Sequence, residues 1–384
     1  MPFNRLCALL TGVAIALSAV TAQAQAEYDG QAPNVLVMDY NTGQVLVERN
    51  ADVPLPPASM SKLMTLNMLF EAIDEGRVDL DTTFTVSERA YAMGGSRMFL
   101  ETRDRPTAED LIRGIAVLSG NDATVVVAEG LAGSEEAFAQ LATARARQLG
   151  MEDTNLTNAS GWPDPEHRMS LRDLAILSAH LVEEHPDFYP YLAEREFTWN
   201  DITQPNRVPL LGTGLGLDGL KTGHTTEAGY ALTGSAVQGE RRVIFVFSGL
   251  DSARARTEEA ERIINWAFRQ FTERRVVEEG QTLAAAEVWM GAEREVPLIA
   301  PRDLDILVPV FSDAEVEARV VYDGPLPAPI AEGDEVARLI VQVPEMNAFE
   351  IPLVAGRDVA EGGFMPRMRA AATVLAGHLG LNMQ

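Results

Sequence analysis

The chain has 384 residues, of which 46% are hydrophobic and 23% are charged, and its formal net charge at pH 7 is −25. This composition provides for a large buried core and argues against long disordered tracts. The negative charge argues against nucleic acid as a partner, because phosphate groups are bound by basic surfaces.

Residues 1–26 have the pattern of a secretory signal peptide. The apolar stretch at 6–20 follows Arg5 and is too short to span a bilayer comfortably. The alanines at the ends of 22–24 and of 24–26 both offer the small-residue pattern of a signal peptidase cleavage site. The single cysteine, Cys7, lies in this segment. We therefore expect an exported protein with no disulfide, thiol nucleophile or cysteine-bound metal.

Residues 27–275 are expected to form an α+β domain. Strand-like runs at 34–38 and 44–48 come first, joined by a turn at 41–43. Helical patterns and capping residues then predict helices at 60–73, 111–118, 123–131, 134–148 and 171–181. Strand-like runs at 230–237 and 242–248 and a helix at 258–271 follow. This order is typical of an antiparallel sheet that is built from both ends of a domain around a helical insert.

Beyond this domain the pattern changes to short alternating runs separated by Gly, Pro and Asp, which predicts a small β-sandwich or barrel over 276–361. The expected strands are 288–290, 295–298, 306–310, 316–321, 336–343 and 349–354. The last residues, 362–384, have an apolar side and basic residues, among them Arg367 and Arg369. This pattern favours an amphipathic, membrane-associating helix over a loose tail.

Three short motifs carry the candidate chemistry. In Ser59-Met60-Ser61-Lys62, a serine and a lysine three residues apart at the start of a helix lie side by side. A lysine takes the proton of a serine hydroxyl only if burial and nearby positive charge lower its pKa. Ser119-Gly120-Asn121 and Lys221-Thr222-Gly223 would supply a second hydroxyl and that charge. Each motif alone is weak, but the three in this order are specific.

The positions of the lysines in the chain indicate the same motifs. The chain has 31 Lys and Arg residues together, and Lys62 and Lys221 are its two lysines. Arginine cannot lose its proton in a protein, whereas a lysine ammonium can. A chain that otherwise uses arginine keeps lysine at two motif positions, which indicates that arginine would fail there.

These motifs resemble those of the low-molecular-mass penicillin-binding proteins, specifically the D-alanyl-D-alanine carboxypeptidases of the bacterial periplasm. The resemblance covers most of 33–275, and the β-rich segment after Val277 resembles the C-terminal domain of that family. The family-like segments are 58–65, 119–123, 160–162 and 219–225, together with His167, Ser170, Arg172 and Asp173. The resemblance implies the β-lactamase/transpeptidase fold, an antiparallel sheet flanked by helices with a helical subdomain, followed here by the small all-β domain.

The resemblance also implies roles for single residues. Ser59 would be the acylated nucleophile, Lys62 its base, and Ser119 the group that passes the proton toward the leaving D-alanine amine. Asn121 would hold the substrate amide, and Lys221 would provide positive potential near the second serine.

The resemblance also implies which residues contact the substrate. Thr222 would contact the terminal carboxylate of the substrate, with Gly223 beside it. The backbone N–H groups of His224 and of the nucleophile would form the oxyanion hole, where charge develops in the transition state. Arg256 resembles a family arginine near the carboxylate site, but Arg254 is close enough to leave this assignment open.

His180 and His185, with the glutamates at 183–184, invite a metal interpretation. Residues five apart on a helix lie about 140° apart around its axis. We therefore expect the two imidazoles to diverge into solvent, and we predict no metal and no cofactor.

The predicted function is that of a periplasmic serine-type D-Ala-D-Ala carboxypeptidase that trims the terminal D-alanine from peptidoglycan stem peptides and is acylated by β-lactams. A D,D-endopeptidase, a β-lactamase of the same fold and a catalytically idle wall-peptide-binding protein stay open as alternatives. Glu166 lies where class A β-lactamases carry their deacylating glutamate, but the asparagine that follows it there is Ser170 here. We expect Glu166 to be a polar loop residue.

Overall fold

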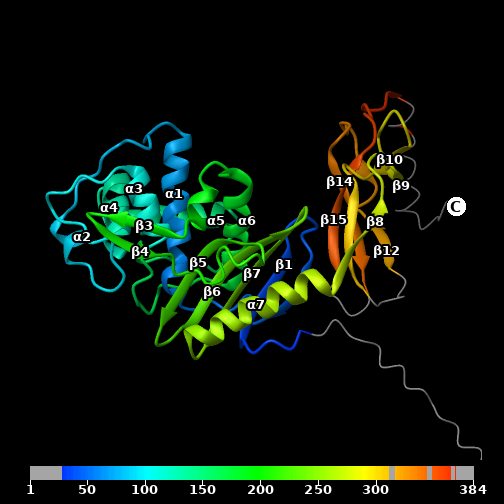
Figure 1. Ribbon diagram of the computed structural model, residues 1–384. Coiled ribbons are helices and arrows are strands. Elements are labelled where there is room, and N and C mark those ends of the chain that lie inside the picture. The colour runs from blue at the N-terminus through cyan, green and yellow to red at the C-terminus, as the bar shows by residue number, and fades with distance from the viewer. Residues whose placement is uncertain (1–27, 311–315, 344–347, 365–367, 369–384) are drawn as a thin grey trace, which may run out of the picture.

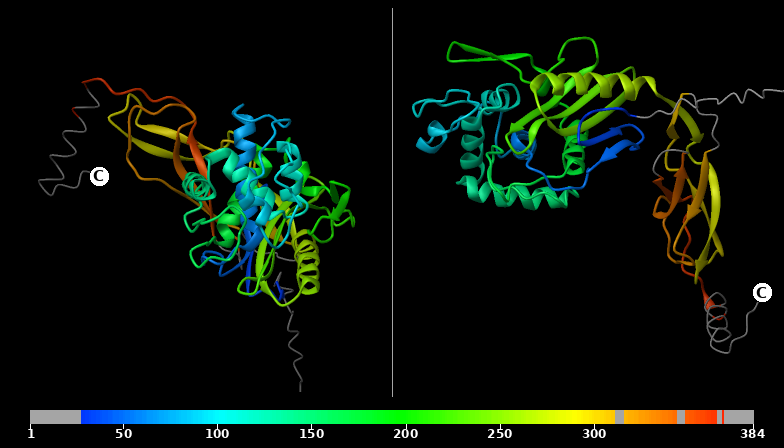
Figure 2. Two further views of the ribbon diagram at one scale, coloured as in Figure 1. Left: turned by 90° about the vertical axis from the view of Figure 1, so that its left-hand side faces the viewer. Right: turned by 90° about the horizontal axis from the view of Figure 1, so that it is seen from below.

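The computed structural model describes residues 28–310, 316–343, 348–364 and 368. They form an α+β domain and a β-rich unit that stands beyond the end of its last helix (Figure 1, Figure 2). The expected signal peptide at 1–26 lies outside the described residues, and so does most of the expected tail at 362–384. No helix among the described residues is long and apolar enough to cross a membrane.

The α+β domain is built on an antiparallel sheet with the strand order β2-β1-β7-β6-β5. The strands are β1 (Asn34–Asp39), β2 (Val45–Arg49), β5 (Leu217–Thr225), β6 (Gly229–Gln238) and β7 (Arg241–Leu250). Because Val35 pairs with Phe247, the two ends of the domain meet in the middle of the sheet. This confirms the expectation of a sheet built from both ends.

Strand β5 was not predicted. Strands were expected only at 230–237 and 242–248 in this region, and the lysine motif at 221–223 precedes them. The motif lies within β5, where Lys221 pairs with Thr233 of β6. The strand contains Gly219 and Gly223, and most of its residues are buried on both faces. It therefore lacks the polar–apolar alternation by which a strand is recognised in a sequence.

The helical block contains the expected helices, and the first and last residues of each helix differ by a few positions from the prediction. It comprises η1 (Ala58–Ser61), α1 (Lys62–Asp74), α2 (Glu88–Ala92), α3 (Ala108–Ala116), α4 (Asn121–Ala132), α5 (Glu135–Gln148), α6 (Leu171–Glu184) and η2 (Tyr189–Ala193). The predicted capping box of Thr107 and Asp110 is present. The hairpin of β3 (Glu196–Trp199) and β4 (Ile202–Pro205) follows this block.

Helices cover both faces of the sheet, because successive strand residues point to opposite sides. Val35 and Phe245 pack with the apolar side of α7 (Ala253–Arg269). Leu36 and Ile244, one position along each strand, pack with α1 and α6 on the other face. Helix α7 begins five residues before the expected start, because the side chain of Ser252 accepts a hydrogen bond from the N–H of Ala255 and caps it.

The β-rich unit has strands near all the expected places, although β9 begins six residues before the expected 288, and it has two further strands, β8 with seven residues and β13 with two. Its main sheet has the order β12-β14-β15-β10-β9-β13, and β8 pairs with β11 beside it. The strands are β8 (Phe271–Val277), β9 (Thr282–Trp289), β10 (Glu295–Ile299), β11 (Leu304–Pro309), β12 (Glu317–Val321), β13 (Leu326–Pro327), β14 (Glu335–Gln342) and β15 (Phe349–Ala355). Strand β8 starts almost directly after α7, so it crosses the boundary expected at 276.

Candidate active site

The three motifs converge on one cleft of about 610 Å³ between η1, strand β5 and the segment around β4. The cleft is lined by Ser59, Ser96, Ser119, Thr203, Gln204, Pro205, Asn206, Arg207, Thr222, Gly223, His224, Tyr230 and Arg256. Six of these residues belong to the set expected from the sequence. Both lysines are buried next to this cleft and do not line it.

The serine and lysine of the first motif are in direct contact. Ser59 lies in the turn η1 and is half-buried, and Lys62 is the first residue of α1. The Nζ atom of Lys62 lies 2.9 Å from Ser59 Oγ and donates a hydrogen bond to the carbonyl oxygen of Ser160. This is the contact that a serine and its base require.

The environment of Lys62 favours its neutral form. Its side chain is fully buried, and this burial, together with the positive charge of Arg207, lowers the pKa of Lys62 to about 7, while Asp122 acts in the opposite direction. A general base works best when its pKa lies near the working pH. The lysine is therefore able to accept a proton at neutral pH, which an exposed lysine is not.

Two glycines allow the backbone to pack closely around the nucleophile. A Cβ atom on Gly161 would lie 1.9 Å from the carbonyl oxygen of Ala58, and Gly161 also has a φ of +74°. A Cβ atom on Gly223 would lie 2.9 Å from the carbonyl oxygen of Pro57. Strand β5 and the loop after Ser160 thus approach the turn η1 with no side chain between them.

The second motif lies between α3 and α4. Ser119 is almost fully buried and has a φ of 59°, and it borders the cleft. Asn121 begins α4, and its side-chain amide donates a hydrogen bond of 2.8 Å to the carbonyl oxygen of Gly94. Asn121 therefore holds the segment that carries Ser96, a residue of the cleft wall, and is not part of the cleft lining itself.

Asp122 lies in the family-like segment 119–123, but no role was assigned to it from the sequence. Its carboxylate is fully buried and accepts hydrogen bonds from the backbone N–H groups of Met98 and Leu100. It fixes the segment beside the cleft, and its charge raises the pKa of Lys62 against the effect of burial. An aspartate directly after Asn121 was the signal that could have identified it.

Lys221 is buried in β5, and its hydrogen bond to the carbonyl oxygen of Thr222 is long, at 3.4 Å. Burial lowers the pKa of Lys221 well below its usual value, and the charges of Lys62, Arg207 and Arg256 add to this effect. Several positive groups therefore share this cleft in a chain whose net charge is −25. An anionic ligand would relieve their repulsion.

The geometry separates the two arginines between which the sequence left a choice. Arg254 is exposed and pairs with Glu258 on the surface of α7. Arg256 lines the cleft, with its guanidinium 5.7 Å from the ring centre of Tyr230. Its Nε is buried and has no hydrogen-bond partner among the described residues.

His224 and Arg207 complete the lining. The imidazole of His224 is exposed and lies 4.0 Å from the ring centre of Tyr230. Arg207 donates a hydrogen bond to the carbonyl oxygen of Leu118. Sequence reasoning missed Arg207, because it is a single arginine in an irregular segment with no motif around it.

Glu166 is an exposed loop residue, as expected. The expectation for the two histidines is wrong. His185 is buried, His180 is largely buried, and their ring centres lie 5.5 Å apart. The helical spacing argument does not apply, because α6 ends at Glu184 and His185 has a non-helical backbone with φ −123° and ψ 47°.

Comparison with known proteins shows which family the chain belongs to. The sequence matches the family described as D-alanyl-D-alanine carboxypeptidase over residues 19–252, and the C-terminal domain of penicillin-binding protein 5 over residues 271–361. It is 36% identical over 341 residues to the D-alanyl-D-alanine carboxypeptidase DacD of Escherichia coli, covering 87% of this chain and 88% of that protein.

Solved structures give the same result. Penicillin binding protein 5 from Haemophilus influenzae superposes with a TM-score of 0.77 at 33% identity, covering 87% of this chain and 99% of that chain. The ampicillin-bound Penicillin-Binding Protein D2 from Listeria monocytogenes superposes with a TM-score of 0.58 at 30% identity, covering 63% of this chain and 99% of that chain. The predicted fold class and family are thereby confirmed. The chain belongs to the D-alanyl-D-alanine carboxypeptidase family of serine peptidases, and its second unit is the C-terminal domain found in penicillin-binding protein 5.

Proposed function

We propose that this enzyme removes the terminal D-alanine from peptidoglycan stem peptides through an acyl-enzyme at Ser59. The observation that carries the proposal is the 2.9 Å contact between Ser59 Oγ and Nζ of the buried Lys62. The family supports the reaction class, and the cleft supports the assignment of the residues.

In the first step, the neutral amine of Lys62 takes the proton of the Ser59 hydroxyl as Oγ attacks the carbonyl carbon between the two D-alanines. The backbone N–H groups of Ser59 and His224 stabilise the oxyanion that forms. When the C–N bond breaks, the proton that Lys62 holds is passed through the hydroxyl of Ser119 to the departing amine, so Lys62 is neutral again and D-alanine leaves.

In the second step, a water molecule attacks the ester carbonyl of the acyl-enzyme. The base, Lys62, takes a proton from this water, and Oγ of Ser59 leaves with a proton to restore the hydroxyl. The peptide departs one residue shorter, with a new terminal carboxylate.

The positive groups of the cleft suit a substrate that ends in a carboxylate. Arg256 has a buried Nε without a hydrogen-bond partner among the described residues, and Thr222 and Gly223 lie on the same wall. We assign the carboxylate to these residues, with Arg207 also lining the cleft and Lys221 buried beside it. The carboxylate would favour the protonated form of Lys221 against the effect of burial. Asn121 would hold the substrate amide while its side-chain NH₂ group keeps the hydrogen bond to the carbonyl oxygen of Gly94.

We also infer that β-lactams acylate Ser59, because their strained amide presents the same carbonyl to the same nucleophile. The similar Listeria protein whose structure is described as ampicillin-bound supports this inference. The signal-like pattern at 1–26 supports a reaction in the periplasm, where the peptide substrate would be found. The basic and apolar pattern at 362–384 supports peripheral contact with the inner membrane.

The test is intact-protein mass spectrometry with penicillin, followed by product analysis with a pentapeptide that ends in D-Ala-D-Ala. We expect one covalent adduct per chain, release of free D-alanine and a product one residue shorter. In Ser59→Ala both the adduct and D-alanine release should be lost, with thermal unfolding unchanged. A wild-type yield of adduct in Ser59→Ala would overturn the assignment of the nucleophile.

A further inference from the structure

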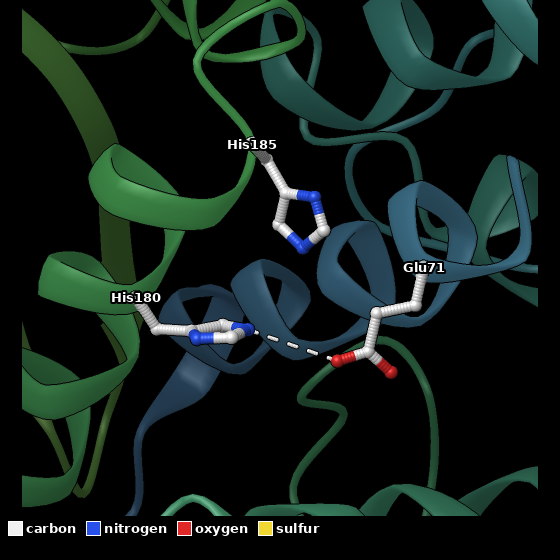
Figure 3. Close-up of side chains that lie close together, drawn as sticks. All are labelled: Glu71, His180 and His185. Carbon is white, nitrogen blue, oxygen red and sulfur yellow. Dashed lines mark ion pairs between the residues drawn. The ribbon is translucent and has the colours of Figure 1, made fainter. Parts of the chain in front are cut away.

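His180 and His185, which were expected to point apart, lie together in a cluster of polar side chains outside the candidate active site. Glu71 lies near the C-terminal end of α1, His180 lies on α6, and His185 directly follows α6 (Figure 3). One ligand atom from each of these three side chains lies within 4.8 Å of the other two. Glu71 is nine residues after Lys62 on the same helix, which is roughly 14 Å along its axis, so the cluster is separate from the candidate active site.

His185 is held in one orientation by a carboxylate. Its Nδ1 lies 2.8 Å from Oδ2 of Asp74, and its side chain is only 4% exposed. With Nδ1 donating to this carboxylate, Nε2 is the ring nitrogen that is left to bind a ligand. Nε2 is buried, has no hydrogen-bond partner among the described residues and points into the space between His180 and Glu71 (Figure 3). A carboxylate behind a histidine in this way is the usual support of a metal ligand.

His180 contributes a second free nitrogen. Its Nε2 is buried without a hydrogen-bond partner among the described residues and faces Oε1 of Glu71 at 3.7 Å. Burial, with the neighbouring His185 as the second cause, lowers the pKa of His180. A lowered pKa favours the neutral imidazole, which is the form that binds a metal.

The charges around the cluster are mixed. Arg145 donates to Oε1 of Glu71 at 2.8 Å, and Asn67 donates to the same oxygen at 2.9 Å. The second oxygen, Oε2, has no such bond among the described residues. The negative charges of Asp74 and Glu184 oppose that of the guanidinium. Oε1 is the oxygen that faces His180 and accepts these two hydrogen bonds, whereas Oε2 points away from the histidines (Figure 3). The carboxylate would therefore have to turn so that Oε2 meets a divalent cation together with the Nε2 atoms of the two imidazoles.

We propose that Glu71, His180 and His185 form a zinc site that joins the end of α1 to the end of α6. Two imidazoles and one carboxylate are a ligand set that Zn²⁺ takes in proteins, with a water molecule in the fourth position. Zinc ligands at about 2.0–2.1 Å from the ion lie roughly 3.4 Å from one another in a tetrahedral site. Side-chain rotations that bring the ligand atoms closer by up to about 1.4 Å, from separations of up to 4.8 Å, would close the site.

The test is a titration of the chelator-treated chain, made without a histidine tag, with Co²⁺ followed by visible absorption and with Zn²⁺ in competition. We expect one equivalent of metal and a higher unfolding temperature with zinc. His180→Asn and His185→Asn should each weaken binding at least about tenfold, and Asp74→Asn by about 10–100-fold through the supporting carboxylate. Glu183→Gln, which removes an exposed carboxylate from the same helix, is the matched control and should bind as the wild type does.

Circular dichroism shows whether each variant is folded. If His185→Asn does not fold, the less buried His180 and the supporting Asp74 still decide the question. Binding below one equivalent, or equal binding by wild type and folded His180→Asn, would overturn the proposal. The outcome is independent of the peptidase, because penicillin labelling reports on the cleft and metal titration on this cluster.

Discussion

The two lysines occupy similar buried surroundings, and we expect them to respond differently to the same substitution. Lys62→Arg keeps the charge but cannot accept the proton of Ser59, so the rate of acylation by penicillin should fall by about 10²–10⁴-fold, as loss of a general base implies. Lys221→Arg keeps the electrostatic role and should lose much less, limited by the fit of the larger guanidinium. Stopped-flow acylation rates with one β-lactam measure both. Equal and small losses would contradict the assignment of the base.

The lowered pKa of Lys62 sets the expected pH dependence. The base must be neutral to act, so the second-order rate of acylation should rise with pH and level off above about 7, the pKa of this group. An unperturbed lysine would give an inflection near 10 instead. A pH profile of the acylation rate with an uncharged reporter substrate makes the measurement, and an inflection that stays unchanged in Lys62→Arg would contradict the interpretation.

At this scale, the sequence was informative wherever chemistry restricts the residue type. Lysine stood out at Lys62 and Lys221 because arginine replaces it elsewhere in the chain. Arg207 was missed because arginine is common here and its position in the cleft depends on tertiary packing. His185 was misjudged because one backbone conformation at the end of a helix redirects a side chain, and no local pattern reports this.

Elements that follow a simple period were predicted well, and those that depend on context were not. The caps of α3, α5 and α6 were found because each begins with a serine or threonine before a periodic helix. Strand β5 was missed because its glycines and lysine serve close packing and do not alternate. The first turns of α7 were missed because their arginines and small residues show no apolar helical periodicity, which is typical of a loop.

The cap of α7 gives a prediction at the scale of the element. Ser252→Ala removes the side chain that accepts from the N–H of Ala255, so the free energy of unfolding should fall by about 0.5–2 kcal/mol. Urea unfolding followed by circular dichroism measures this change. Ser252→Asp, which keeps an acceptor at the helix N-terminus, is the control and should restore most of the stability. No difference between the two variants would mean that this cap contributes little.

At the scale of the whole molecule, the tail should affect location and not catalysis. Deletion of 362–384 should release the chain from anionic vesicles, because its apolar side and its arginines would bind the membrane surface. Turnover of a soluble peptide should not change, because the cleft is lined only by residues from 59 to 256. Co-sedimentation at low and high salt makes the comparison. If the full-length chain also fails to sediment at low salt, the tail has no anchoring role.

The pairing of β1 with β7 also determines when the serine becomes reactive. The cleft draws on residues from Ser59 to Arg256, and β1 finds its neighbour only at the far end of the domain. Lys62 is buried only in the folded domain, where the carbonyl oxygen of Ser160 and the charge of Arg207 also lie close to it. Before these later segments are in place, we expect its ammonium group to stay hydrated and protonated. An emerging chain therefore carries an inert hydroxyl. We therefore expect the nucleophile to be activated only after the last strand of the sheet has arrived, so that the topology would time the onset of reactivity.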